Sequence, residues 1–170
     1  MITIEDEGVT FAAKGDAIEA RLTRNLDNTP LEVWAALTQP ERMVDWLAPG
    51  AIELRAGGAA KLNFEDSGIV IDSTVSAIEP PCVLEYSWSG PGEPLRPLRW
   101  VIEPSADGAV LTLTLLSPAG EDAGRAAAGF AAHLDMLAAA LAGVPIKFPF
   151  ERFKTARDAF RARLATTPAT

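Results

Sequence analysis

The stretch DAGRAAAGFAAHLDMLAAALA, residues 122–142, decides the fold of this chain. Its large apolar residues recur at the spacing of one helical face, and alanines widen that face: Phe130, Leu134, Leu137 and Leu141, with Ala127, Ala131 and Ala138. Gly143 and Pro145 follow, and both are residues that end helices. The pattern predicts a helix over residues 122–142 with a broad apolar face that a neighbouring layer can approach closely.

Residues 51–116 supply the surface against which such a helix can pack. The hydrophobic period falls to two in this region, and turn residues interrupt it at 57–58, 66–68, 80–81, 90–97 and 107–108. The apolar sets are Ile52/Leu54, Leu62/Phe64, Ile69/Ile71/Val75, Leu84/Tyr86/Trp88, Leu98/Trp100/Ile102 and Leu111/Leu113/Leu115. Polar residues alternate with them, so each strand has one wet and one dry face. Six consecutive strands with short connections predict an antiparallel meander, and the helix at 122–142 is expected to cover its dry face.

Two further patterns precede this meander. Residues 9–13 alternate, Gly15-Asp16 can form a tight reversal, and residues 18–26 resume the alternation, which predicts an opening β-hairpin. Thr29-Pro30-Leu31-Glu32 and Thr38-Gln39-Pro40-Glu41 then each place a Thr three residues before a Glu. We expect both to be capping boxes, in which the Thr hydroxyl and the Glu carboxylate each accept from the other residue's backbone N–H. Two short helices are therefore predicted.

A second helical pattern runs over residues 150–164, with Phe150, Phe153, Phe160 and Leu164 on one side. Arg157 falls inside this stripe. We expect its stem to pack and its guanidinium to snorkel or meet a carboxylate; the alternative is a contact with an anionic ligand or a partner chain.

Length, composition and charge bear on the number of domains, the kind of partner and the cellular location. A chain of 170 residues with 48% apolar and 22% charged residues favours one globular domain over residues 1–170. A net charge of −8 repels phosphate backbones and anionic lipids, so neither a nucleic-acid partner nor membrane insertion is expected. The beginning MITIEDEG does not read as a signal peptide, and no apolar run approaches the ~18–20 residues of a membrane span. We expect a cytoplasmic protein.

No catalytic constellation is evident in the sequence. His133 is the only histidine and Cys82 the only cysteine, and their spacing groups them with no carboxylates, so no metal ligands, catalytic residues or cofactor are predicted. Cys82 is interpreted as a buried small apolar residue. There is no Gly-x-Ser-x-Gly motif, and Gly57-Gly58 is interpreted as a turn or bulge.

His133 and four tryptophans are the remaining candidates for a ligand-binding site. His133 falls about 60° from the centre of the helical stripe, where it is either a boundary histidine hydrogen-bonded to a strand or water, or one polar group that caps a pocket. Trp88 and Trp100 lie on dry strand faces, whereas Trp34 and Trp46 belong to the short helices that can close one end of the sheet. Large rings opposite an alanine-rich helix favour unfilled volume between the two layers.

The order of strand, two short helices, antiparallel meander and long C-terminal helix over residues 17–143 resembles the START-like, helix-grip (SRPBCC) superfamily. More closely, it resembles the bacterial proteins named for similarity to the C-terminal domain of the Hsp90 ATPase activator. The motifs are PLEVWAALTQPE at 30–41 followed by Trp46-Leu47, Gly57-Gly58, VLEYSW at 83–88 and LTLT at 111–114. The resemblance implies an α+β helix-grip fold: a curved antiparallel sheet of six to eight strands wrapped around the long helix, two short helices after the first strand, and residues 150–164 as an additional helix.

The resemblance also implies a cavity between helix and sheet, which in the superfamily holds lipids, hormones, polyketides and other apolar molecules. Carried over by position, the ligand-binding candidates are Phe64, Trp88, Trp100, Leu113, Phe130, His133 and Leu137, with Trp46 near the mouth. The family pattern usually has Gly-Trp where this chain has Gly129-Phe130, and the smaller ring is expected to enlarge or reshape the space under the helix.

The expected function is non-enzymatic binding of a small apolar or amphipathic molecule. One alternative is a protein-interaction module, either a homodimer using Phe150, Phe153 and Phe160 or a partner of a chaperone, the latter only by family name. A less favoured alternative is a cyclase- or hydrolase-like enzyme, which needs two polar side chains converging in the cavity, such as His133 and a carboxylate.

Overall fold

The computed structural model describes residues 8–65 and 67–166, so Asp66 of the turn expected at 66–68 lies outside the described residues. The strands are β1 Val9–Lys14, β2 Ala17–Leu26, β3 Gly50–Ile52, β4 Ala59–Phe64, β5 Ile69–Glu79, β6 Val83–Ser87, β7 Pro97–Ser105 and β8 Gly108–Ser117. The helices are α1 Pro30–Thr38, α2 Pro40–Met43, α3 Ala123–Leu141 and α4 Phe150–Thr166. The opening hairpin, the two short helices, the six-strand meander and both C-terminal helices are therefore confirmed.

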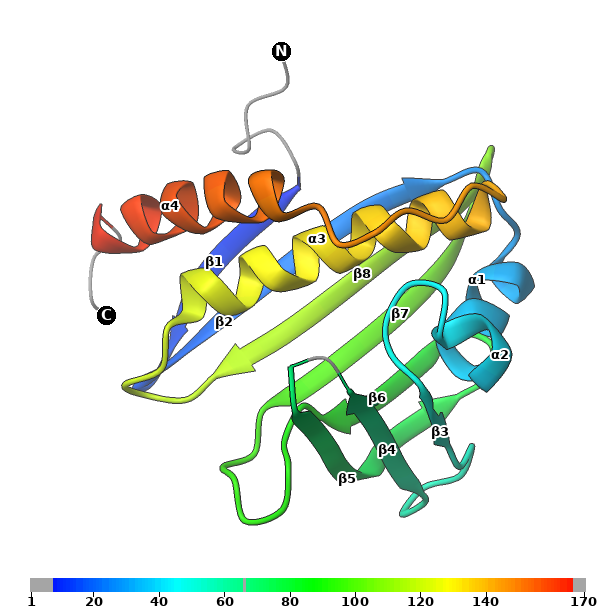
Figure 1. The fold of residues 1–170 in the computed structure, drawn as a ribbon, viewed down its shortest axis with the longest axis horizontal. Coiled ribbons are helices and arrows are strands. Elements are labelled where there is room, and N and C mark those ends of the chain that lie inside the picture. Colours follow the sequence, from blue (N-terminus) through cyan, green and yellow to red (C-terminus); the bar gives the residue numbers. More distant parts are fainter. Residues whose placement is uncertain (1–7, 66, 167–170) are drawn as a thin grey trace.

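The strands form one antiparallel sheet in the order β1-β2-β8-β7-β6-β5-β4-β3. The sheet curves, and α3 lies across its concave face while α4 runs beside α3 (Figure 1). The two short helices follow β2, the first strand of the region 17–143, and stand at one end of the sheet. This is the α+β helix-grip arrangement that the sequence predicted.

The register of the central strands brings the apolar residues onto the face that α3 covers. Trp100 of β7 pairs with Leu113 of β8, and both side chains are at most 1% exposed. From α3, Phe130, Leu134 and Leu137 are buried in the same core. Alternation in the strands and the 3.6-residue period of the helix thus meet in one apolar layer.

Only the first of the two predicted capping boxes forms. The backbone N–H of Glu32 donates to Thr29 Oγ1 at 3.2 Å, and the N–H of Thr29 donates to Glu32 Oε1 at 3.4 Å. The second prediction is wrong, because Gln39 is the N-cap of α2 and makes no side-chain cap bond. Thr38 is the last residue of α1, and its hydroxyl donates to the Trp34 carbonyl at 2.8 Å. A Thr in the last turn of a helix can donate its hydroxyl to a carbonyl four residues earlier. The Thr38 hydroxyl is engaged in this way and does not cap the next helix.

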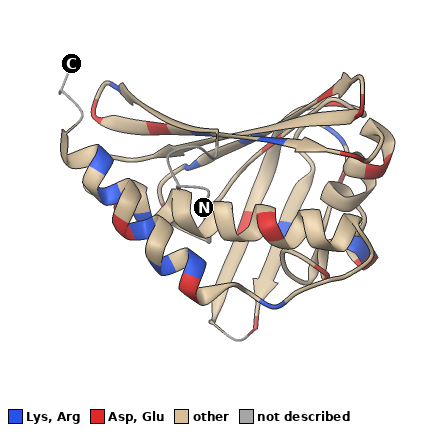
Figure 2. Ribbon diagram, turned by 90° about the horizontal axis from the view of Figure 1, so that it is seen from above, with Lys and Arg blue, Asp and Glu red and all other residues tan. Residues whose placement is uncertain are grey.

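The ends of α3 match the prediction. Asp122 is the N-cap and accepts from the N–H of Arg125 at 3.0 Å, while Gly143, with φ of 82°, follows the last turn. Asp122 also accepts from Arg161 of α4, and Asp135 accepts from Arg152. These ion pairs hold α4 along α3, and Figure 2 shows basic and acidic residues alternating on α4 beside an α3 that carries few charges.

The stripe of α4 is mostly covered within the chain. Phe160 is buried against Phe11 of β1, with ring centroids 5.5 Å apart, and Phe153 is half-buried, whereas Phe150 is 65% exposed. Arg157 Nε donates to Asp158 Oδ1 at 3.1 Å, and its guanidinium lies 5.8 Å from the centre of the Phe153 ring. The expectation that Arg157 meets a carboxylate is confirmed.

The interpretation of Cys82 as a buried residue is wrong, because Cys82 is exposed. It lies in the tight connection between β5 and β6, where its N–H donates to the Glu79 carbonyl at 2.7 Å. Turns of this kind run over the surface, so the residue does not reach the dry face of the sheet. Gly57 does form the expected turn, with φ of 78°.

No helix in the part of the chain that the structure describes is long and apolar enough to span a membrane.

Candidate ligand-binding site

Seven aromatic side chains from six segments are linked by ring contacts around α3, and we call them the ring cluster. They are Trp46 after α2, Phe64 at the end of β4, Trp88 after β6, Trp100 in β7, Phe130 and His133 in α3, and Phe148 in the α3–α4 connection. Six of these seven residues are among the eight that the sequence analysis named. Folding therefore brings most of the predicted set into one place.

The rings touch in a chain of edge-to-face and tilted contacts. Trp46 and Trp100 lie 5.7 Å apart between centroids, and Phe130 joins Trp100 to Trp88 at 6.5 and 5.0 Å. Phe64 then lies 5.7 Å from Trp88 and 5.9 Å from His133. Edge-to-face contacts of this kind add about 0.5–1.5 kcal/mol each beyond the burial of the rings.

Exposure divides the ring cluster into an inner and an outer part. Trp46, Trp100 and Phe130 are 1%, 1% and 4% exposed and belong to the core. The outer rings, which are Phe64, Trp88, His133 and Phe148, are half-buried and so retain accessible surface. The outer rings are therefore the part of the ring cluster that solvent reaches.

The remaining predicted residues lie on the inner side. Trp46, expected near the mouth, occupies the buried end of the ring cluster, and its Nε1–H donates to the Ala36 carbonyl at 2.8 Å. Leu113 and Leu137 are 0% and 1% exposed and pack in the core. These three residues shape the floor of the site, whereas the outer rings form its accessible wall.

His133 is held by a backbone group rather than by another side chain. Its Nδ1 lies 2.9 Å from the Trp46 carbonyl oxygen, so the partner is the turn after α2 instead of the strand or water expected from the sequence. Burial lowers the pKa of His133, and the bond to Trp46 opposes this only in part. The neutral imidazole is therefore favoured at neutral pH.

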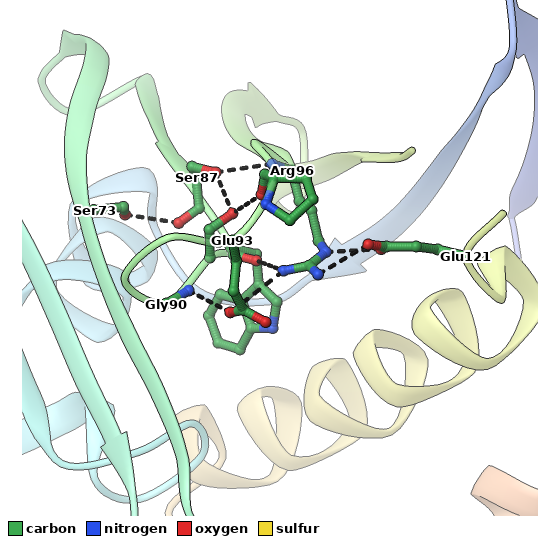
Figure 3. A network of polar contacts seen from close by, with 9 residues as sticks. Ser73, Ser87, Gly90, Glu93, Arg96 and Glu121 are labelled. Atoms are coloured by element: carbon green, nitrogen blue, oxygen red, sulfur yellow. Dashed lines mark hydrogen bonds and ion pairs between the residues drawn. The ribbon is translucent and has the colours of Figure 1, made fainter. Parts of the chain in front are cut away.

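Trp88 is positioned by a network of polar contacts in the loop that follows β6 (Figure 3). Arg96 donates to both carboxylate oxygens of Glu121, at 2.7 and 2.9 Å, and to the Trp88 carbonyl at 3.1 Å. Glu121 in turn raises the pKa of Arg96, while Arg96 lowers the pKa of Glu121. The buried Ser87 hydroxyl accepts from the Arg96 backbone N–H at 2.8 Å. The loop is thereby tied to the segment that leads into α3.

Phe148 is the site residue that the sequence analysis missed. It lies in the segment that runs back alongside α3 (Figure 1), with its ring 5.5 Å from that of His133. Pro145 and Pro149 flank it, and prolines favour an extended chain, which was the available signal. The segment falls after residue 143, where the resemblance to known proteins ended.

Gly129 borders open space on α3. It lies one helical turn before His133 on α3, and a Cβ added there would meet no atom within 4 Å. By contrast, a Cβ at Gly124 would lie 3.0 Å from the backbone nitrogen of Arg161. Gly124 lies in close contact with α4, whereas Gly129 borders open space.

A separate open hollow of about 450 Å³ lies over β3, β4 and β5, lined by Pro49, Gly50, Ala51, Lys61, Leu62, Asn63, Val70, Ile71 and Asp72. It contains none of the eight predicted site residues and no aromatic ring. The outer rings of the ring cluster, which are partly exposed and contact one another, are the candidate site.

The chemistry available at the ring cluster is limited. His133 is its only ionisable side chain, and among residues 8–65 and 67–166 no carboxylate forms an ion pair or hydrogen bond with it. No group of three or more His, Cys, Asp or Glu side chains in the described part of the chain could hold a metal ion.

Comparison with solved structures finds the same architecture in several proteins. A conserved protein of unknown function from Enterococcus faecalis, EF2215, superposes with a TM-score of 0.82 at 14% identity, over 98% of this chain and 96% of that one. CalU16 from Micromonospora echinospora superposes with a TM-score of 0.73 at 23% identity, over 94% of this chain and 96% of that one. DynU16, from the dynemicin biosynthetic locus, superposes with a TM-score of 0.67 at 26% identity, over 75% of this chain and 48% of that one.

No curated protein matches the chain. A family model does match, over residues 27–142, which span the two short helices, the meander and α3 and lie within the region that carried the resemblance. The chain belongs to the family of Activator of Hsp90 ATPase homolog 1-like proteins, within the SRPBCC fold.

Proposed function

We propose that this protein binds a small apolar or amphipathic molecule, without a covalent step, at the outer part of the ring cluster. The observation that carries the proposal is the gradient of exposure along a continuous set of rings. Phe64, Trp88, His133 and Phe148 keep accessible surface, although each contacts another ring of the cluster. Sites for small molecules are lined mainly by apolar and aromatic side chains with a few polar groups.

The position of Gly129 supports the same site. Space beside His133 stays open on α3, whereas the alanines and Gly124 elsewhere on this helix allow close packing. An apolar molecule that occupies this space removes ring surface from water, at about 25 cal/mol per Å² of apolar area.

The comparisons support a small-molecule ligand more than a protein partner. DynU16 is described by its place in a biosynthetic locus, and SRPBCC proteins include ligand binders. A chaperone partner would rest on the family name alone. On the sequence argument we expect the protein to act in the cytoplasm.

Titration of tryptophan fluorescence with flat apolar molecules tests the proposal, because Trp88 lies at the outer rings. Naphthalene is a suitable first probe. We expect saturable quenching that Gly129→Leu abolishes, since the added side chain fills the open space beside His133. Ala138→Leu is the matched control on the same helix, because Ala138 is exposed and belongs to no ring contact. Quenching that is absent, or equal in both variants, would contradict the proposal.

A further inference from the structure

We infer that Nε2 of His133 is a hydrogen-bond acceptor inside the site, and that the ligand is an aromatic molecule carrying a hydroxyl or N–H donor rather than a carboxylate. This inference rests on the proposed function, since it names the chemical class of the molecule bound at the ring cluster.

The tautomer of His133 follows from its partner. A backbone carbonyl oxygen can only accept a hydrogen bond, so at 2.9 Å from the Trp46 oxygen Nδ1 must carry the proton. In a neutral imidazole the other nitrogen then has a lone pair and no hydrogen. The contact with Trp46 therefore makes Nε2 an acceptor.

Nε2 has no partner of its own within the described residues. No hydrogen bond to it is formed by residues 8–65 or 67–166, and it is not among the enclosed side-chain atoms that lack a partner. An acceptor that is neither bonded nor enclosed is accessible to a molecule entering the site. It is the polar group that a ligand donor can satisfy.

The surroundings of the imidazole favour a flat aromatic molecule. Rings of Phe64, Phe130 and Phe148 lie 5.9, 6.2 and 5.5 Å from it. Such rings offer faces and edges for another ring but no strong donor or acceptor. A molecule that stacks here orients itself by one polar contact, and Nε2 provides it.

A carboxylate is disfavoured by the same surroundings. A carboxylate needs a cation or several donors, and burial holds the imidazole in its neutral form by lowering its pKa. A carboxylate oxygen facing the lone pair of Nε2 would be repelled. The site therefore selects a donor such as a phenolic hydroxyl.

Four related probes test the inference: naphthalene, β-naphthol, the methyl ether of β-naphthol and β-naphthoate. The proteins are wild type and His133→Asn, whose amide keeps a donor toward Trp46 but has no second ring nitrogen. On wild type we expect β-naphthol to bind roughly three- to tenfold more tightly than its methyl ether. In His133→Asn the ratio of the β-naphthol affinity to the methyl ether affinity should fall to about one, whereas the loss of the imidazole ring should weaken naphthalene and the two naphthol probes alike.

The outcomes separate this inference from the proposed function. If no probe binds, the proposed function falls. If naphthalene and the ether bind but the hydroxyl preference is absent, or unchanged in His133→Asn, only the present inference falls. Tighter binding of β-naphthoate than of β-naphthol would overturn it as well.

A second measurement does not depend on the variant. Nitrogen NMR of wild-type protein reports the imidazole tautomer directly, and we expect the Nδ1–H form. Addition of β-naphthol should shift the Nε2 resonance as its lone pair accepts a hydrogen bond, whereas the methyl ether should not. Observation of the Nε2–H form in the free protein would contradict the inference even if His133→Asn failed to fold.

Discussion

The imidazole of His133 in α3 donates its Nδ1–H to the backbone carbonyl of Trp46, which lies 87 residues earlier in the chain, at 2.9 Å. This bond joins the long helix to the turn that follows the two short helices. It also places the proton on Nδ1 and leaves the lone pair on Nε2. The contact between α3 and this turn therefore determines that the polar group of the ring cluster is an acceptor.

Loss of this bond should weaken the fold. In His133→Phe the ring contacts can be retained, but the carbonyl of Trp46 loses its imidazole partner. Loss of a partner for a buried polar group costs about 1–3 kcal/mol. We expect the free energy of unfolding in urea to fall by this amount in His133→Phe, and by less in His133→Asn, whose amide can still donate. Equal losses in the two variants would show that the bond to Trp46 is not responsible.

Stability should also depend on the protonation of His133. Burial lowers its pKa in the folded state, whereas the unfolded side chain keeps a pKa near 6.5. Between these two values the unfolded chain binds more protons than the folded one, so stability falls as the pH drops through about 6.5 and levels off below the folded pKa. Within the described residues, the hydrogen bond and ring contacts of the imidazole are with Trp46, Phe64, Phe130 and Phe148, none of which has a charge that titrates in this window.

Urea unfolding of wild type and His133→Phe across this range measures the effect as a difference. We expect the stability gap between the two proteins to shrink as the pH falls through about 6.5. Glu121 and Asp122 also titrate, but their pKa values lie below the usual 4.5 and 3.8, so their contributions are lost at lower pH. A gap that is independent of pH would mean that His133 titrates alike in both states.

Two glycines of α3 should respond oppositely to alanine. At Gly129 an added Cβ meets no atom within 4 Å, so Gly129→Ala should stabilise the protein by about 0.5–1 kcal/mol through the higher helix propensity of alanine. At Gly124 the Cβ would lie 3.0 Å from the backbone nitrogen of Arg161, so Gly124→Ala must push α4 away from α3. We expect it to lower the melting temperature, and thermal unfolding of both variants gives the comparison. The same sign in both would contradict the packing described.

The ion pair between Arg96 and Glu121 should matter more for the site than for stability. Both side chains are partly exposed, so Arg96→Ala should cost no more than about 1 kcal/mol of unfolding free energy from the lost ion pair. The variant also releases the carbonyl of Trp88, and we expect weaker quenching of tryptophan fluorescence by bound naphthalene. Arg99→Ala is the control, because Arg99 lies opposite Glu85 in the sheet and forms its ion pair with that residue. If the two variants bind naphthalene equally well, Arg96 does not position Trp88.

The sequence by itself determined the elements of this protein and their order. Alternation in residues 51–116 predicted the strands, the spacing of Phe130, Leu134 and Leu137 predicted α3, and the capping box at Thr29 predicted the start of α1. These signals are local, because the side-chain period of a strand or helix is set by backbone geometry within a few residues. The same local signals did not separate Thr38 as a helix end from Thr38 as a cap, since both positions suit a Thr.

Only the tertiary structure decided which rings form the floor of the site and which form its accessible wall. Trp46 was expected near the mouth and Trp88 on the dry face of a strand, yet Trp46 is buried and Trp88 half-exposed. The role of Phe148 and the bond between His133 and Trp46 depend on segments that are distant along the chain. Exposure and hydrogen-bond partners are properties of the packed layers, so they arise only when the sheet has curved around α3 and the α3–α4 connection has returned along it.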